Sequence, residues 1–284
     1  MEIIKSIKEM RHWSDQCRRL GQTIALVPTM GYLHEGHLSL MHEGRRLGDK
    51  VVVSIFVNPT QFGPGEDLST YPRDLERDFH LAQSAGVDIL FTPNAWEVYP
   101  NGFDTYIDQE KLPDHLCGLS RPGHFKGVMT VVTKLFHIVA PQVAIFGEKD
   151  YQQLAIIRRM AKDLNFDIEI ISHATVREPD GLAMSSRNVK LSSEQRKSSL
   201  SLNLALQHAQ KRLHEGEIRS DRLIQEATDL ILSYPGTAVD YIRICDPDTL
   251  DAVFTVDRPA LMALAIKLGP VRLIDNRLLT PSHQ

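Results

Sequence analysis

The sequence predicts an α/β fold, in which helices cover both faces of a mostly parallel sheet, followed by a smaller α+β domain. Short apolar runs with strand character recur along the chain, at residues 23–27, 51–57, 87–91, 143–146 and 167–171. Segments with helical spacing lie between most of these runs, at residues 37–47, 74–85, 126–139 and 151–164. This alternation is typical of a parallel sheet that is buried on both faces.

The pattern changes after Val176. Two long helical patterns at residues 193–214 and 220–233 precede strand-like segments at 238–245, 261–267 and 272–274. Helices followed by strands without alternation indicate a separate α+β domain, so we expect domains over 1–175 and 176–284. Residues 96–123, rich in Pro, Gly and polar residues, interrupt the first domain, and such long insertions are more often functional than accidental.

Composition narrows the class of protein. The 284 residues carry a formal net charge of -4, which gives no broad basic field and makes nucleic acid a poor partner. Cys17, Cys117 and Cys245 are odd in number and far apart, so we expect reduced thiols rather than disulfides. No apolar run approaches the roughly 18 residues of a membrane span, and the N-terminus does not resemble a secretory signal. We expect a soluble cytoplasmic protein.

The most informative motif is PTMGYLHEGHLSL, residues 28–40, where a predicted strand leads into a predicted helix. His34 and His37 flank Glu35 and Gly36 near the helix N-terminus, where unpaired N–H groups favour an anion. Imidazole donors suit phosphate oxygens. Capping and metal ligation are the alternatives, although no Cys pair or HExxH pattern supplies a further metal ligand. The nearby glycines favour phosphate, because they allow a ligand to approach the backbone closely.

Polar residues follow other predicted strands as well. The second strand is followed by residues 58–63 and the fourth by residues 147–153, where Lys149 could face a phosphate and Asp150 could cap a helix or bind Mg²⁺. A solvated lysine is the alternative for Lys149. Residues 121–127 form a basic, glycine-flanked turn that suits either an anion or surface capping.

The junction between the predicted domains contains residues 184–187, Met-Ser-Ser-Arg, whose hydroxyls and guanidinium suit a phosphate clamp. An ordinary Ser-rich loop is the alternative. The P-loop, the GxGxxG fingerprint after the first strand and the GxSxG elbow do not occur in the sequence. A P-loop kinase, a standard NAD dehydrogenase and a Ser hydrolase are therefore disfavoured.

The HxGH element and the later MSSR loop resemble the nucleotidyltransferase superfamily with its HIGH and KMSKS signatures. Five longer motifs resemble the pantothenate synthetases, in that family's order. They are PTMGYLHEGHLSL, VVSIFVNPTQFGPGEDLSTYPR, RPGHFKGVMTVVTKLF, FGEKDYQQL and REPDGLAMSSRN.

The resemblance implies a Rossmann-like domain that binds nucleotide and pantoate, and a C-terminal lid domain. It implies a ligase of pantothenate biosynthesis, on the pathway to coenzyme A, that condenses (R)-pantoate with β-alanine. ATP is consumed through a pantoyl adenylate, and AMP and pyrophosphate are released. Mg²⁺ is expected with ATP, and the family implies a homodimer.

The resemblance also assigns roles to residues of this chain. His37 corresponds to the family's proton donor, and His34, Lys149 and Arg187 are the other expected catalytic groups. Gln61 is expected to contact pantoate and β-alanine, and Gln153 to contact pantoate. The residues expected to bind ATP are Met30, Gly31, Tyr32, Leu33, His34, Glu35, Gly36, His37, Gly147, Glu148, Lys149, Asp150, Val176, Met184, Ser185, Ser186 and Arg187. Asp78 and Asp150 are possible metal ligands.

One departure from the wider superfamily concerns the MSSR loop, which has no lysine before its methionine. This agrees with pantothenate synthetases and leaves more of the cationic role to Lys149 and Arg187. Two other functions remain open at this point. One is a nucleotidyltransferase that leaves the nucleotide on its product, and the other is a nucleotide-sensing protein without activity.

Overall fold

The computed structural model describes residues 1–282, which form two compact units. Unit 1 contains residues 1–110, 121–148 and 156–174, and unit 2 contains residues 111–120, 149–155 and the chain from 175 onward. The main crossing at 174/175 lies one residue from the predicted domain boundary. Two short segments of the predicted first domain belong instead to unit 2, so the division at 175/176 stays a prediction.

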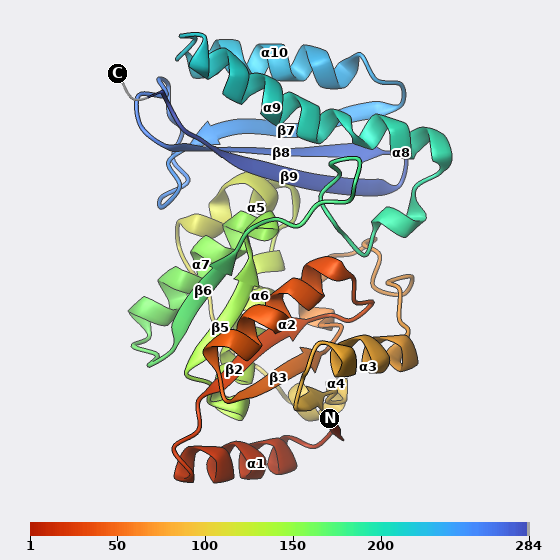
Figure 1. Cartoon of the computed structure of the whole chain (residues 1–284), viewed down its shortest axis with the longest axis vertical. Helices are drawn as coiled ribbons and strands as arrows, with labels where there is room; N and C mark the ends of the chain where they lie inside the picture. Colours follow the sequence, from red (N-terminus) through yellow and green to blue (C-terminus); the bar gives the residue numbers. More distant parts are fainter. Residues whose placement is uncertain (283–284) are drawn as a thin grey trace. The chain divides into compact units, whose positions relative to one another are not determined.

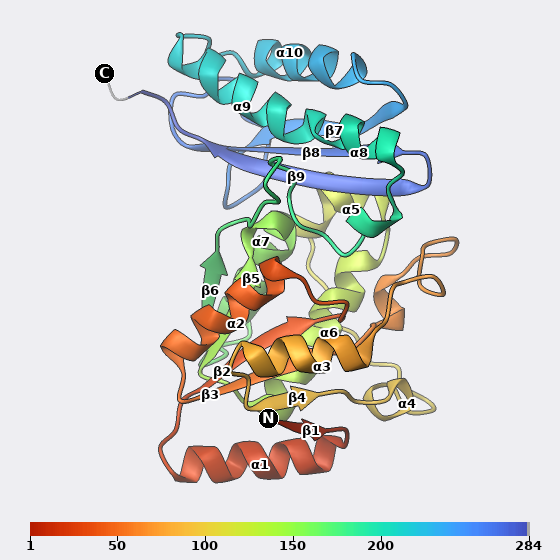
Figure 2. The same ribbon diagram turned by 45° about the vertical axis from the view of Figure 1, so that its right-hand side comes forward.

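Unit 1 contains a six-stranded sheet in which every pair of neighbours is parallel (Figures 1 and 2). Its strands are β1 (Glu2–Ile4), β2 (Ile24–Thr29), β3 (Lys50–Ile55), β4 (Ile89–Phe91), β5 (Val143–Gly147) and β6 (Glu169–His173), in the order β1-β4-β3-β2-β5-β6. The predicted fold class is confirmed. β1 was not predicted, because a strand of three residues is too short to give a recognisable sequence pattern.

The helices of unit 1 leave the sheet buried on both faces. They are α1 (Ile7–Arg19), α2 (Glu35–Leu47), α3 (Leu75–Ser84), α4 (Ala95–Val98) and α6 (His124–Val139), with the 3₁₀ turn η1 (Pro59–Gln61). The short turn η3 (Glu148–Asp150) and helix α7 (Tyr151–Asp163) are divided between the two units. α2 packs beside α3, whereas α1 packs beside α6 (Figures 1 and 2).

Burial along β2 explains its apolar run. All four residues from Ile24 to Val27 are fully buried. Ala25 and Val27 join the core under α2 and α3, with Leu38 and Met41. Because successive side chains of a strand point to opposite faces, Ile24 and Leu26 fill the other face. A strand covered on both sides is continuously apolar rather than alternating.

Unit 2 has the predicted α+β character. Its three-stranded antiparallel sheet contains β7 (Thr237–Cys245), β8 (Ala260–Leu268) and β9 (Val271–Leu279) in that order. Helices α8 (Ser193–Ser199), α9 (Ser201–His214) and α10 (Ser220–Leu232) follow one another, and α9 and α10 lie side by side along this sheet (Figure 2). The smaller elements are η2 (Leu112–Asp114), α5 (Leu116–Ser120) and η4 (Asn188–Lys190).

Two helical predictions differ from the structure. The predicted helix at 193–214 is two helices, which meet at Leu200. Ser199 and Ser201 hydroxyls there donate to the carbonyls of Arg196 and Ser198, and such local bonds compete with the regular helix ladder. Residues 7–19 were not predicted as a helix, although Ser6 caps them.

The insertion at 96–123 contains short helical turns but no strand, and its residues 111–120 join unit 2. Across residues 1–282, none of the helices combines the length and the apolar character needed to span a membrane.

Candidate functional site

The predicted site residues of unit 1 follow the carboxyl ends of neighbouring strands. β3, β2 and β5 lie next to one another and run parallel, so their ends share one sheet edge (Figure 1). The chain adds β3 and β4 on one side of β2 and β5 and β6 on the other, so the strand order reverses between β2 and β5. Ligands of open α/β sheets bind at such a reversal.

His34 and His37 lie at this point, on the first turn of α2. His34 is the N-cap, and the centroids of the two imidazole rings are 4.0 Å apart. The backbone N–H of His34 donates to Nδ1 of His37 over 3.3 Å. Because Nδ1 accepts this bond, a neutral His37 carries its ring proton on Nε2. Both side chains are half-buried, as suits groups that meet a ligand.

The turn between β2 and α2 is held by Asp78 of α3. Its two carboxylate oxygens accept hydrogen bonds from the backbone N–H groups of Tyr32 and Leu33, each over 2.7 Å. Gly31 and Tyr32 both have positive φ, +85° and +51°. This conformation is unfavourable for a tyrosine, so the two bonds from Asp78 stabilise a strained turn.

Asp78 was a predicted metal ligand, and its environment does not suit that role. The residue is 1% exposed, and both oxygens already accept backbone hydrogen bonds. Burial raises the pKa of the carboxyl, whereas these bonds act in the opposite direction. Within residues 1–282, no three His, Cys, Asp or Glu side chains are grouped so as to hold a metal. The metal role of Asp78 stays a prediction, which this bonding disfavours.

Gln61 lies in η1, after β3, in a buried network of amides. Its Oε1 accepts from Nδ2 of Asn58 over 3.0 Å, and its Nε2 lies 3.2 Å from the sulfur of Met30. The hydroxyl of Tyr99 donates to Oδ1 of Asn58 over 2.8 Å and lies 3.1 Å from the hydroxyl of Thr60. These contacts fix which end of each amide is the donor.

Burial raises the pKa of Tyr99 to about 12, so its phenol keeps its proton at neutral pH. The hydroxyl of Tyr99 therefore always acts as a donor to Asn58, which in turn donates to Gln61. The Nε2 group of Gln61 then faces the sulfur of Met30. Met30 and Gln61, predicted from different motifs, are thus in contact.

The basic turn at 121–127 supports the backbone of Gln61 rather than standing apart from it. Nδ1 of His124 lies 2.8 Å from the Gln61 carbonyl oxygen. Arg121 forms a bidentate ion pair with Glu66 at 2.7 and 2.6 Å, and its Nη1 lies 3.0 Å from Nε2 of His124. The arginine holds the pKa of the Glu66 carboxyl below its ordinary value. The ion pair ties the segment after η1 to the turn that precedes α6.

Unit 2 contains the second group of predicted residues. Lys149 is the second residue after β5, and its ammonium lies 3.7 Å from the carboxylate of Asp150. Gln153 follows in the first turn of α7 and is half-buried. The adjacent Gln152 is buried, donates to the carbonyls of Leu112 and His115 and accepts from the N–H of residue 117.

The predicted phosphate clamp begins at the end of a short hairpin. The N–H of Met184 donates to the carbonyl of Val176 over 3.0 Å, which brings two predicted ATP-binding residues together. Beyond the hairpin, the hydroxyl of Ser185 accepts from the N–H of Arg187 over 3.3 Å, and Ser186 is buried.

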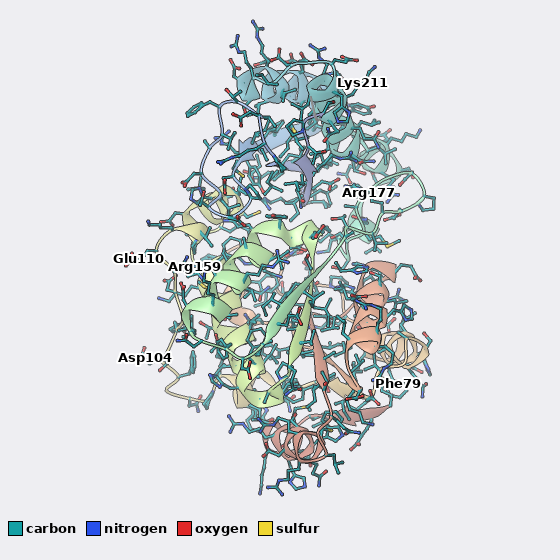
Figure 3. All side chains as sticks on the ribbon, turned by 60° about the vertical axis from the view of Figure 1, so that its left-hand side comes forward. Phe79, Asp104, Glu110, Arg159, Arg177 and Lys211 are labelled. Carbon is teal, nitrogen blue, oxygen red and sulfur yellow. The ribbon has the colours of Figure 1, made fainter. Side chains whose placement is uncertain are left out.

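The hairpin is also tied to the rest of unit 2. Arg196 of α8 pairs with the carboxylates of Glu178 and Asp180, at 2.8 and 2.5 Å. The guanidinium of Arg177, labelled in Figure 3, binds Asp275 of β9 through two hydrogen bonds of 2.7 and 3.0 Å. The hairpin is therefore bonded to both α8 and β9.

The structure thus brings Met30 into contact with Gln61 in unit 1, and Met184 into contact with Val176 in unit 2. Sequence reasoning missed the supporting residues, which are Asn58, Tyr99, Asp275 and Asn276. Asn58 belongs to residues 58–63, which follow the second predicted strand, so its position in the sequence could have indicated a role near Gln61. No sequence pattern could have indicated the role of Tyr99, because it is 38 positions from Gln61 in a stretch without periodicity.

Comparison with known proteins gives a consistent result. The model of the family described as Pantoate-beta-alanine ligase matches residues 2–278. A protein named pantothenate synthetase from Desulfatibacillum aliphaticivorans is 59% identical over 281 residues, which cover 99% of this chain and 100% of the relative. One of the same name from Syntrophotalea carbinolica is 56% identical over 276 residues, covering 97% and 98%.

Solved structures agree. The pantothenate synthetase of Thermus thermophilus has a TM-score of 0.94 and 44% identity, covering 99% of this chain and 100% of that one. The pantoate-beta-alanine ligase of Francisella tularensis, complexed with beta-gamma ATP and beta-alanine, has a TM-score of 0.82 and 35% identity, covering 98% and 97%. By sequence and by fold, this chain is a member of the pantoate-beta-alanine ligase family.

Proposed function

We propose that this chain condenses (R)-pantoate with β-alanine at the expense of ATP, forming pantothenate, AMP and pyrophosphate through a pantoyl adenylate. The observation that carries the proposal is the His34–His37 pair on the first turn of α2, where the strand order reverses, in a chain of this family. The Francisella relative, crystallised with an ATP and β-alanine, supports the choice of substrates.

In the first step, a carboxylate oxygen of pantoate attacks the α-phosphorus of ATP. An O–P bond forms, the bond to the β-phosphate oxygen breaks, and pyrophosphate leaves with the electron pair. Charge grows on the bridging oxygen, so donors aimed at it act mainly in the transition state. His37 suits this role, since its Nε2 carries the proton. We assign His34, Lys149 and Arg187 to the remaining phosphate oxygens.

In the second step, the neutral amine of β-alanine attacks the acyl carbon of the adenylate. A C–N bond forms, the acyl C–O bond breaks, AMP leaves, and the amine releases a proton. We assign Gln61 to both acids, because one amide offers a donor and an acceptor. Gln153 is assigned to pantoate. Because the enzyme holds both reactants close together, proximity supplies much of the rate enhancement.

The wider ATP site is proposed to include residues 30–37, Gly147–Asp150, Val176 and residues 184–187. We propose that Mg²⁺ enters with the triphosphate, held mainly by phosphate oxygens and water. Asp150 is the better protein ligand of the two predicted acids, since its side chain is half exposed. We also propose a homodimer that acts in the cytoplasm, and sedimentation of the purified chain tests the dimer.

Incubation with ATP, pantoate and β-alanine tests the function. AMP and pyrophosphate are expected in equal amounts, with release that requires pantoate and a product mass equal to that of pantothenate. ADP formation, or AMP release without either acid, would overturn the proposal. A product that retains the nucleotide would identify the alternative nucleotidyltransferase, and binding of ATP without turnover would identify a sensing protein.

A further inference from the structure

Two adjacent residues of β9, Asp275 and Asn276, contact Arg177 and Lys149, which lie next to or within the parts of unit 2 that we assign to ATP. Neither belongs to the motifs that identified the family. Successive side chains of a strand point to opposite faces of its sheet. Two neighbouring residues can therefore contact two different segments of the chain.

Asn276 holds the backbone at Lys149. Its Nδ2 donates to the Lys149 carbonyl oxygen over 2.9 Å, although the two residues are 127 positions apart. Lys149 lies in the short turn η3, where a 3₁₀ geometry gives weaker hydrogen bonds than an α-helix. A side-chain bond from a sheet fixes the peptide plane from which the lysine extends.

Asp275 holds the hairpin that leads to residues 184–187. It is 2% exposed and binds Arg177 through both oxygens. The same guanidinium donates to the Gly181 carbonyl oxygen over 3.1 Å, across the turn of the hairpin. One Asp275 oxygen also accepts a hydrogen bond from the backbone N–H of Asn276 over 2.8 Å, which links the two residues directly.

We propose that Asp275 and Asn276 are positioning residues for ATP, which set Lys149 and the 184–187 segment in register with each other before ATP binds. This rests on the proposed function, which assigns both segments to ATP. Donors fixed in advance need not reorganise when charge develops on the leaving pyrophosphate, and such supporting contacts hold a site to the required precision.

The two half-reactions separate positioning from folding. Pantoate-dependent exchange of pyrophosphate into ATP measures adenylation, whereas release of AMP from supplied pantoyl adenylate and β-alanine measures the second step. Asn276→Ala removes the donor to Lys149 without adding charge. We expect exchange to fall at least tenfold and the second step to change less than twofold. Asn276→Asp, which keeps the shape but loses the donor, should behave alike.

Leu278→Ala is the matched control, because it shortens an exposed side chain on the same strand. It should leave both half-reactions unchanged. Equal losses in both steps for Asn276→Ala would mean a general structural role and would overturn the proposal, as would unchanged exchange. Failure of the wild-type protein to make pantothenate would instead overturn the proposed function.

Discussion

Gly127 of α6 has no room for a methyl group, and this allows a sharp test of how Gln61 is positioned. A Cβ at this position would lie 2.4 Å from the carbonyl oxygen of Thr60 and 2.7 Å from Cα of Gln61. Both neighbours are backbone atoms of η1, so they cannot rotate away. The Gly127→Ala variant must therefore displace the turn that carries Gln61.

The structure gives the size of the effect. Overpacking of this kind costs about 1–3 kcal/mol. Displacement also endangers the 3.1 Å hydrogen bond from buried Asn58 to the Gly127 carbonyl, and an unsatisfied buried amide costs about 1–3 kcal/mol. Because alanine has a higher helix propensity than glycine, the substitution also stabilises α6 by about 1 kcal/mol. We expect a net loss of about 1–5 kcal/mol, with a rise of at least fivefold in KM for pantoate.

Urea unfolding measures the free energy of unfolding of the Gly127→Ala variant and of the wild type. The chain has two tryptophans, Trp13 and Trp96, and both lie in unit 1, so their fluorescence reports on this unit. Gly44→Ala is the matched control, since Gly44 is also helical but a Cβ there meets only side chains at 3.5–3.6 Å. It should be neutral or stabilise by up to about 1 kcal/mol. If Gly127→Ala matched this control in stability and in KM, the steric reasoning would be refuted.

Three further predictions concern unit 1. Replacing His37 by Ala should slow adenylation about 100-fold or more, because one oxyanion-type donor is lost, while urea unfolding stays unchanged; wild-type burst rates would contradict the role. Tyr99→Phe removes the donor to Asn58 and should raise KM for pantoate several-fold while KM for ATP stays constant, as steady-state kinetics would reveal. The lowered pKa of Glu66 means that its pairing with Arg121 adds stability above the ordinary value of 4.5 and loses it as the pH falls through the folded-state pKa. Unfolding of wild type and Glu66→Gln between roughly pH 3 and 6 should therefore converge at the acid end, and parallel curves would disprove the linkage.

Much of unit 1 was predictable because its signals are local. The continuous apolar run of β2 follows from burial on both faces, and the histidines lie at the start of the next element, α2. The exits of β2, β3 and β5 share an edge because parallel strands all end on the same side. The order of the strands in the sheet was not predictable from any residue pattern.

The supporting contacts were not predictable, because they join residues that are distant in sequence. Asn276 and Lys149 are 127 positions apart, and Tyr99 is 41 positions from Asn58. Hydrogen bonds between side chains and remote backbone leave no periodicity. The break at Leu200 was missed for a related reason, since serine is compatible with a helix until its hydroxyl binds a nearby carbonyl.

The Asp78 contact has a consequence for transplanting the histidine motif into other proteins. A glycine-rich dinucleotide turn carries its shape within its own sequence. The shape of the turn at Tyr32 and Leu33 instead depends on a carboxylate that lies 46 and 45 positions downstream of these residues. A designer who grafts PTMGYLHEGH onto another parallel sheet must also bring α3 at the same distance, or the grafted turn will relax and the two imidazoles will change position.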